Sequence, residues 1–128
     1  HHASSAASDV YKRQPLGLDK NDQTYNLNAD TAAGYIAKKI NARRLIILSD
    51  VEGVLDNNKN LIPEINSESI KNLIDNEIIT GGMIPKINNC LDVVSNGVKG
   101  VVIIDGRKNH SVLFELLSDE GSGTLIRQ

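Results

Sequence analysis

The segment TGGMIPK, residues 80–86, combines two glycines, a proline and a lysine directly before a stretch with helical periodicity. Glycine backbone can approach a phosphate chain closely, and a helix that begins near Pro85 would point the positive end of its dipole at the same place. Lys86 would add a full positive charge there. The segment is therefore equally typical of a phosphate site and of a glycine turn that leads into a helix with a solvated lysine.

A second group of polar residues precedes the amphipathic pattern of residues 30–40. The segment YNLNAD, residues 25–30, places two carboxamides and a carboxylate there. Asn28 or Asp30 is suited to cap the helix, which is the ordinary role of such residues at a helix start. The functional alternative is that Asn26 hydrogen-bonds a polar ligand while Asp30 orients lysine side chains.

A third candidate follows the apolar run of residues 44–50. Ser49 and Asp50 would stand at the carboxyl end of a strand, with Gly53 in the loop beyond it. Open α/β sheets hold ligands beyond the carboxyl ends of their strands, so this loop is a candidate nucleotide site, although a turn alone explains Gly53. The spacings of a Walker A loop, a dinucleotide fingerprint and a nucleophile elbow are absent. The histidines show no metal-ligand spacing.

Hydrophobic patterning predicts the elements that must position these residues. Continuous apolar runs at 44–50 and 100–105 are typical of strands buried on both faces of a parallel sheet, and Pro63 restricts residues 61–65 to an edge or hairpin position. Helices are expected at 30–40, 67–75, from Pro85 onward and at 111–117, with a final strand at 123–128. This alternation predicts a layered α/β fold. Cys90 falls on an apolar helical stripe and is expected in the core, and His110 at a helix start.

Composition limits the domain count and the classes of partner. With 128 residues and 40% hydrophobic composition, one domain is expected, over residues 15–128; residues 1–14 lack any period and look like a tag or foreign sequence. Fourteen basic against 16 acidic residues, with 3% aromatics, argue against nucleic acid. No apolar stretch is long enough to cross a membrane, and a cytoplasmic protein is expected.

Taken in order, the segments YNLNADTAAG, LIILSDVEGVLD, IITGGMIPK, GVVIIDGR and DEGSGT resemble the C-terminal half of the acetylglutamate kinases, in the amino acid kinase family. The resemblance covers about residues 15–126. It implies a three-layer αβα sandwich with a mainly parallel sheet. It also implies phosphorylation of the side-chain carboxylate of N-acetyl-L-glutamate by ATP with Mg²⁺, the second step of arginine biosynthesis. Alternatives are a related kinase for glutamate, aspartate, carbamate or a nucleoside monophosphate, and an inactive nucleotide-binding module.

The same resemblance assigns roles to individual residues. Asn26 would bind acetylglutamate, Asp30 would organise the active-site lysines, and Lys86 would stabilise charge on the transferred phosphoryl group. The implied nucleotide-binding residues are Asp50, Val51, Glu52, Gly53, Val54 and Leu55, together with Ile78, Ile79 and Thr80. No residue is implied as a metal ligand.

The first half of the family pattern has no counterpart in this sequence. It includes a glycine-rich phosphate loop, a second lysine and an arginine for the substrate's α-carboxylate. We therefore expect the chain to be the nucleotide-binding half of an enzyme, inactive alone, with surface exposed that the other half would cover. DEGSGT, residues 119–124, resembles the ending of members inhibited by arginine, which makes arginine a candidate feedback inhibitor. The intact protein is expected to be a homo-oligomer, a dimer or a hexamer.

Overall fold

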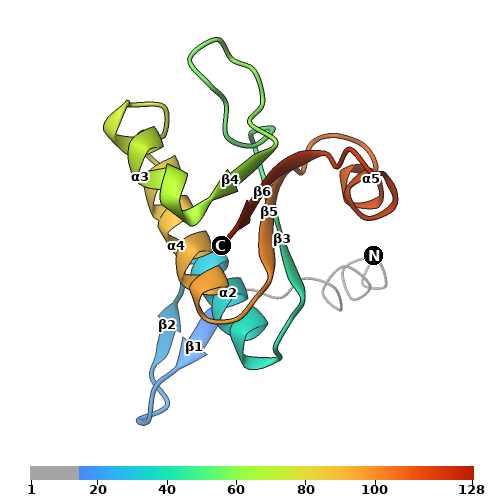
Figure 1. The fold of residues 1–128 in the computed structure, drawn as a ribbon. Coiled ribbons are helices and arrows are strands. Elements are labelled where there is room, and N and C mark those ends of the chain that lie inside the picture. Colours follow the sequence, from blue (N-terminus) through green and yellow to red (C-terminus); the bar gives the residue numbers. More distant parts are fainter. Residues whose placement is uncertain (1–14) are drawn as a thin grey trace.

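The computed structural model describes residues 15–128 and contains a four-stranded sheet in the order β3 (Arg44–Ser49), β5 (Gly100–Asp105), β6 (Gly123–Arg127) and β4 (Glu64–Asn66) (Figure 1). The pairs β3–β5 and β4–β6 are parallel, whereas β5 and β6 are antiparallel. The sheet is therefore mainly parallel, as predicted, with one antiparallel pairing at its centre. The tail predicted for residues 1–14 lies outside the described residues.

Helices lie on both sides of this sheet. Three of them, α2 (Ala29–Lys39), α3 (Ser67–Asp75) and α4 (Met83–Ser95), cover one face, and the short α5 (Ser111–Leu117) lies on the other (Figure 1). A separate antiparallel hairpin, β1 (Leu16–Leu18) and β2 (Thr24–Asn26), leads into α2. The arrangement is the layered α/β fold that the sequence pattern predicts and the three-layer αβα sandwich that the family resemblance implies.

The core lies between the sheet and the three-helix layer. Strand β5 is buried along its whole length, and its alternate residues face opposite sides. Val101 and Ile103 belong to the core under the helices, while Val102 lines a pocket on the α5 side. The core cluster consists of Ala37, Ile47, Val54, Ile65, Ile70, Ile79, Ile87, Cys90, Val93, Val94, Val98, Val101, Ile103 and Ile126.

The prediction that residues 44–50 are buried on both faces was wrong. Strand β3 lies at the edge of the described sheet and is flanked only by β5. Ile47 packs in the core, but Leu48 is 54% exposed because the short α5 leaves that face of β3 uncovered. Other large apolar side chains are also exposed, as expected for a chain that leaves surface uncovered. They include Leu16, Leu18, Tyr35, Ile36, Ile40, Leu113, Phe114, Leu116 and Leu117.

Helix α4 begins at Met83, two residues before the predicted start at Pro85. The turn closes earlier because the Met83 N–H donates to the carbonyl of Thr80 at 3.1 Å and the Ile84 N–H donates to that of Gly81 at 3.2 Å. Pro85 still falls within the first turn, where its missing N–H removes no hydrogen bond.

The other predicted helix starts agree with the structure. Asn28 caps α2 by accepting a hydrogen bond from the Thr31 N–H at 3.1 Å, and His110 directly precedes α5. Across residues 15–128, none of the helices has the length and apolar character to span a bilayer.

Candidate active site

Lys86 and Asp30 form an ion pair where α2 and α4 pack together. Lys86 Nζ lies 2.7 Å from Asp30 Oδ2, although 56 positions separate the two residues in the sequence. Asp30 lies in the first turn of α2, and Lys86 lies at the end of the first turn of α4. The two side chains are 27% and 20% exposed, so the pair is fixed by packing yet open to a ligand.

The pair lies in a cleft of about 440 Å³ at the amino ends of both helices. Its lining consists of Asn28, Asp30, Thr31, Gly82, Pro85, Lys86 and Asn89. Helix amino ends carry unpaired N–H groups and partial positive charge, and here a lysine ammonium is added to them. A polyanion such as a phosphate chain is the ligand that this arrangement favours.

Gly81 and Gly82 leave open space at this cleft. A Cβ added at either residue would have no atom within 4 Å, and Gly81 has a φ of +53°, which favours glycine. Gly82 occupies the cap position of α4 without any side-chain cap. A ligand can therefore approach the backbone at this point without displacing protein atoms.

Cys90 lies on α4 beneath the ion pair and is fully buried. Burial raises the pKa of its thiol to about 12, and the negative charge of Asp30 adds to this effect. The thiol therefore remains protonated at neutral pH and is a core group, as the sequence predicted.

The predicted nucleotide segment Asp50–Leu55 leaves the carboxyl end of β3, and its second half is anchored to β6. The Val54 N–H donates to Thr124 Oγ1 at 2.8 Å, and this hydroxyl donates to the Ile62 carbonyl at 2.7 Å. Gly53 has a φ of +149°, and a Cβ there would lie 2.5 Å from Thr124 Oγ1. Packing therefore requires glycine at position 53. Val54 is buried, and Leu55 forms an isolated antiparallel bridge with Leu61.

The first half of the same segment carries charge. Glu52 Oε1 forms an ion pair with Lys108 Nζ at 2.8 Å. The Ser49 hydroxyl donates a long hydrogen bond to Asp50 Oδ1, at 3.4 Å. Val51, between the two acids, is half-buried. Lys108 follows β5, whose carboxyl end lies beside that of β3.

Asp105 and Arg107 form a second charged group at this edge. Arg107 contacts the carboxylate through its backbone N–H at 2.9 Å, Nε at 2.9 Å and Nη2 at 2.8 Å. These hydrogen bonds lower the pKa of Asp105 to about 2, and those from the guanidinium contribute most. Sequence reasoning missed Asp105, Arg107 and Lys108 as residues beside the nucleotide segment. The available signal was the polar DGRK sequence at the end of a buried strand.

The predicted nucleotide residues Ile78, Ile79 and Thr80 connect α3 to α4. The N–H groups of Ile78 and Ile79 both donate to the Leu73 carbonyl, at 2.9 and 3.1 Å, and the Ile79 side chain is buried in the core. Thr80 is exposed and leads directly into Gly81 at the cleft. At residues 79 and 80, a ligand can therefore reach only main-chain atoms and the Thr80 side chain.

Asn26 is not part of the cleft lining. It lies on β2 opposite Leu16, is exposed, and precedes the cleft residue Asn28 by two positions. The structure therefore joins Asp30 and Lys86 directly. Asn26 lies outside the cleft lining, on the hairpin that precedes α2. The two predicted nucleotide segments lie on the loops after β3 and α3.

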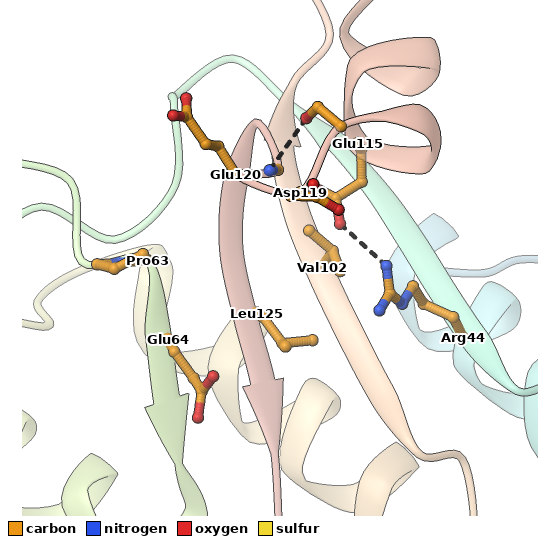
Figure 2. Close-up of a pocket in the computed structure, with 11 residues that line it drawn as sticks. Arg44, Pro63, Glu64, Val102, Glu115, Asp119, Glu120 and Leu125 are labelled. Carbon is orange, nitrogen blue, oxygen red and sulfur yellow. Dashed lines mark hydrogen bonds and ion pairs between the residues drawn. The ribbon is translucent and has the colours of Figure 1, made fainter.

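A separate acidic pocket of about 420 Å³ lies on the α5 face of the sheet (Figure 2). Its carboxylates come from Glu64, Glu115, Asp119 and Glu120. Arg44 reaches across from β3 and places its guanidinium Nη1 3.2 Å from Glu115 Oε1. The Glu115 side chain is 7% exposed, so this pocket already holds a guanidinium against a nearly buried carboxylate.

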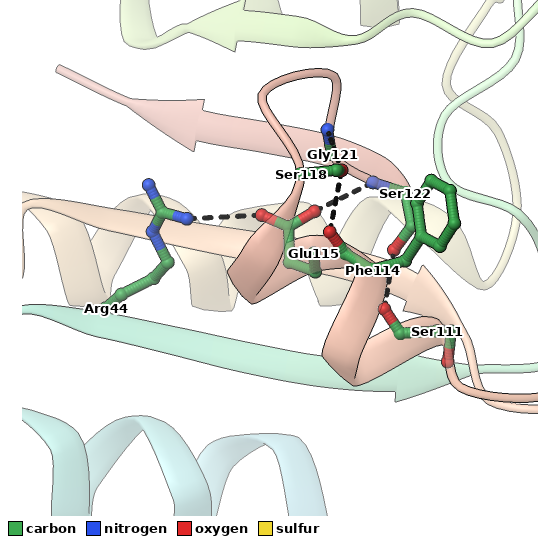
Figure 3. Close-up of polar contacts among 7 residues, drawn as sticks. All are labelled: Arg44, Ser111, Phe114, Glu115, Ser118, Gly121 and Ser122. Carbon is green, nitrogen blue, oxygen red and sulfur yellow. Dashed lines mark hydrogen bonds and ion pairs between the residues drawn. The ribbon is translucent and has the colours of Figure 1, made fainter.

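The loop after α5 fixes this carboxylate from the other side (Figure 3). The Ser122 N–H donates to Glu115 Oε2 at 2.9 Å, and Ser122 Oγ donates to the Ser111 carbonyl at 3.0 Å. Ser118 Oγ donates to the Phe114 carbonyl at 2.7 Å and accepts from the Gly121 N–H at 3.2 Å. The segment DEGSGT therefore folds back on α5 and holds Glu115 towards the pocket.

Residues 12–105 match the model of the amino acid kinase family. The chain belongs to this family. It is 75% identical to the acetylglutamate kinase of Pelagibacter ubique over 114 residues, which are 89% of this chain and 40% of that protein. It is 49% identical to the acetylglutamate kinase of Granulibacter bethesdensis over 126 residues, 98% of this chain and 42% of that protein. The chain thus spans about 40% of the length of these relatives.

Solved structures share the fold. N-acetylglutamate synthase from Neisseria gonorrhoeae, complexed with coenzyme A and L-arginine, matches with a TM-score of 0.81 and 26% identity over 88% of this chain and 26% of that chain. Carbamate kinase from Giardia lamblia bound to AMP-PNP matches with a TM-score of 0.63 and 23% identity over 85% of this chain and 36% of that chain. At that identity the second likeness supports the fold alone.

Proposed function

We propose that this chain is the C-terminal half of an acetylglutamate kinase, which phosphorylates the side-chain carboxylate of N-acetyl-L-glutamate with ATP. The Lys86–Asp30 pair carries the proposal, because it places a fixed ammonium at an open cleft between two helix amino ends. The 75% identity to the Pelagibacter ubique enzyme supports this substrate over those of related kinases.

Phosphoryl transfer depends on positioning and on charge neutralisation more than on covalent help from the protein. In the proposed mechanism, the Lys86 ammonium donates hydrogen bonds to the transferring phosphoryl group, whose oxygens carry the charge of the transition state. Asp30 holds that ammonium in place through the 2.7 Å contact. The backbone at Gly81 and Gly82 approaches the phosphate chain, and Asn26 binds acetylglutamate from the neighbouring hairpin.

Kinase relatives use ATP and a divalent cation, and we propose Mg²⁺ for this protein. The cleft offers one carboxylate, Asp30, which is already paired with Lys86. Among residues 15–128, no three His, Cys, Asp or Glu side chains gather as a metal site. Mg²⁺ commonly binds through substrate phosphates and few protein ligands, so these residues fit a cation that enters with ATP and neutralises phosphate charge.

A chimeric enzyme tests this function, because the chain spans only part of its relatives. Residues 15–128 replace the matching segment of the Pelagibacter ubique kinase, and acetylglutamate phosphorylation is measured with ATP and Mg²⁺. We expect Lys86→Ala to lower kcat by about a hundredfold or more, because a preorganised charge at the transition state is lost. Lys71→Ala, at an exposed lysine on α3, is the matched control.

Two results would contradict the proposal. A chimera that phosphorylates aspartate, glutamate or carbamate in preference to acetylglutamate would assign the chain to another kinase of the family. A chimera that binds ATP in calorimetry but phosphorylates none of these substrates would favour an inactive nucleotide-binding module. Equal kcat values for Lys86→Ala and Lys71→Ala would remove Lys86 from the mechanism.

We also propose L-arginine as a feedback inhibitor that binds the acidic pocket of Glu115. L-arginine would take the place of the Arg44 guanidinium against this carboxylate, and the matching Neisseria gonorrhoeae structure contains L-arginine. Calorimetry should detect L-arginine but not L-citrulline, which lacks the positive charge. Binding should disappear in Glu115→Gln and persist in Glu68→Gln, because Glu68 does not line the pocket. Equal binding of arginine and citrulline would argue against the site.

The proposed setting is the cytoplasm, and the proposed intact protein is a homo-oligomer. The exposed apolar residues Leu113, Phe114 and Leu117 on α5 are a surface that another subunit could cover. Light scattering on the chimera would measure its mass, and a monomer at micromolar concentration would contradict the oligomer.

A further inference from the structure

Helix α4 contacts Asp30 at two points. Lys86 binds its carboxylate, and Asn89, one turn further along α4, donates from Nδ2 to its main-chain carbonyl at 2.8 Å. Residues three apart on a helix lie on the same face, so both side chains reach Asp30 from a single surface of α4. The contact with Asn89 fixes the backbone that carries the carboxylate, while the contact with Lys86 uses the carboxylate itself.

The surrounding packing makes this contact specific. In an α-helix the carbonyl of residue 30 also accepts the N–H of residue 34, so Asn89 adds a second donor to a carbonyl that is already bonded. Residue 34 is Gly34, where an added Cβ would lie 3.2 Å from Asn89 Oδ1 and 2.6 Å from Val93 Cγ2. The carboxamide therefore lies in the closest approach between α2 and α4, with little room to adopt another rotamer.

Asparagine is a weak helix former, because its side chain competes for backbone hydrogen bonds. Within α4 its neighbour Asn88 is exposed, whereas Asn89 is half-buried and bonded to α2. The two residues differ in their contacts and not in their chemistry. They are a matched pair within one helix.

We propose that Asn89 is a positioning residue for the phosphoryl transfer described above, and this inference rests on that proposed function. Asn89 holds the first turn of α2 against α4, which keeps the Asp30 carboxylate at Lys86 Nζ and so keeps the ammonium directed into the cleft. Without the carboxamide, the first turn of α2 loses its lateral contact, and Lys86 follows Asp30 out of alignment.

Kinetics of the chimeric enzyme provide the first measurement. We expect Asn89→Ala to lower kcat about tenfold, since a misplacement of about 1 Å at a catalytic group can cost about a hundredfold in rate. Asn88→Ala should keep the wild-type kcat. Thermal unfolding of both variants should show folded protein at the assay temperature. Equal kcat values for the two variants would overturn the proposal.

Hydrogen exchange of the ligand-free chimera provides the second measurement, because Asn89 also lines the cleft and could touch a ligand directly. A positioning role predicts faster amide exchange across residues 30–35 in Asn89→Ala than in Asn88→Ala. A lower kcat with unchanged exchange would make Asn89 a ligand contact and overturn the positioning role. If the wild-type chimera phosphorylates nothing, the proposed function fails, and exchange alone decides whether Asn89 holds Asp30.

Discussion

The Thr124 hydroxyl joins three segments of the chain, and its removal should loosen the loop after β3. It accepts from the Val54 N–H at 2.8 Å and donates to the Ile62 carbonyl at 2.7 Å, and Thr124 itself is fully buried. Thr124→Val keeps the shape of the side chain but leaves both backbone groups without this partner. The loop that carries the predicted nucleotide residues then has no hydrogen-bonding side chain to hold it on β6.

The expected loss of stability follows from these two groups. A buried N–H left unpaired costs about 1–3 kcal/mol, and the partly buried Ile62 carbonyl adds about 1 kcal/mol. The extra methyl group of valine recovers about 0.8 kcal/mol. The free energy of unfolding should therefore fall by about 2 kcal/mol, which corresponds to a Tm lower by about 7 °C for a domain of this size.

Thr124→Ser is the matched control, because it keeps the hydroxyl and loses only a methyl group, at a cost of about 1 kcal/mol. Urea unfolding of wild type, Thr124→Val and Thr124→Ser gives the three free energies directly. We expect the valine variant to be the least stable and to bind ATP more weakly than the serine variant. A valine variant at least as stable as the serine variant would refute the role assigned to the hydroxyl.

Three further predictions concern the helix contact, the thiol and the strand end. Gly34→Ala should lower the free energy of unfolding by about 1–2 kcal/mol, since overpacking against buried Val93 exceeds the gain in helix propensity; a more stable variant in urea would contradict the close approach. Cys90 should not react with a disulfide reagent at pH 8 until the protein unfolds, because its pKa is about 12, and rapid labelling of native protein would contradict its burial. Arg107 holds the pKa of Asp105 at about 2, below the ordinary 3.8, so this carboxylate stabilises the fold above about pH 4 and ceases to do so as the pH falls towards 2. Acid titration of Asp105→Asn should therefore show a smaller loss of stability over that interval than wild type, and identical curves would argue against the contact.

Elements defined by local patterns were predicted with approximate bounds that agree with the structure. The helices at 67–75 and 111–117 and the strand at 100–105 have the bounds Ser67–Asp75, Ser111–Leu117 and Gly100–Asp105 in the structure. The apolar positions of the two helices follow a helical period, and the strand is a continuous apolar run. Their ends carry polar or glycine residues, so the signal is contained within each segment. The edge position inferred from Pro63 also agrees, because β4 is an edge strand that starts directly after it.

Features that depend on distant residues were not predictable in this way. The exposure of Leu48 depends on what lies across β3, and the antiparallel pairing of β6 with β5 depends on how the chain returns after α5. The early start of α4 depends on two hydrogen bonds to the turn at Thr80 and Gly81. None of these has a periodic signal in the sequence.

The same distinction applies to the candidate site. Residue chemistry indicated a phosphate segment at 80–86 and a polar helix start at 25–30, but only the resemblance to a family joined Asp30 to Lys86. Their contact arises from the packing of α2 on α4, which requires Gly34 at the crossing. Asn89 had one signal that was overlooked, a polar residue next to an apolar stripe on a helix face that must be buried.

Glycines distinguish what the fold requires from what a ligand requires. Gly53 has a protein atom 2.5 Å from the position of a Cβ, and Gly81 has a φ of +53°, so packing explains the first and conformation the second. Gly82 has a φ of −66°, which any residue adopts, and open space around it. The fold therefore offers no steric reason for glycine at position 82, whereas close approach of a phosphate to the α4 amino end does. Gly82→Ala should then change the free energy of unfolding by less than about 1 kcal/mol and still weaken ATP binding. An alanine variant with unchanged ATP affinity would show that no phosphate approaches the backbone at this turn.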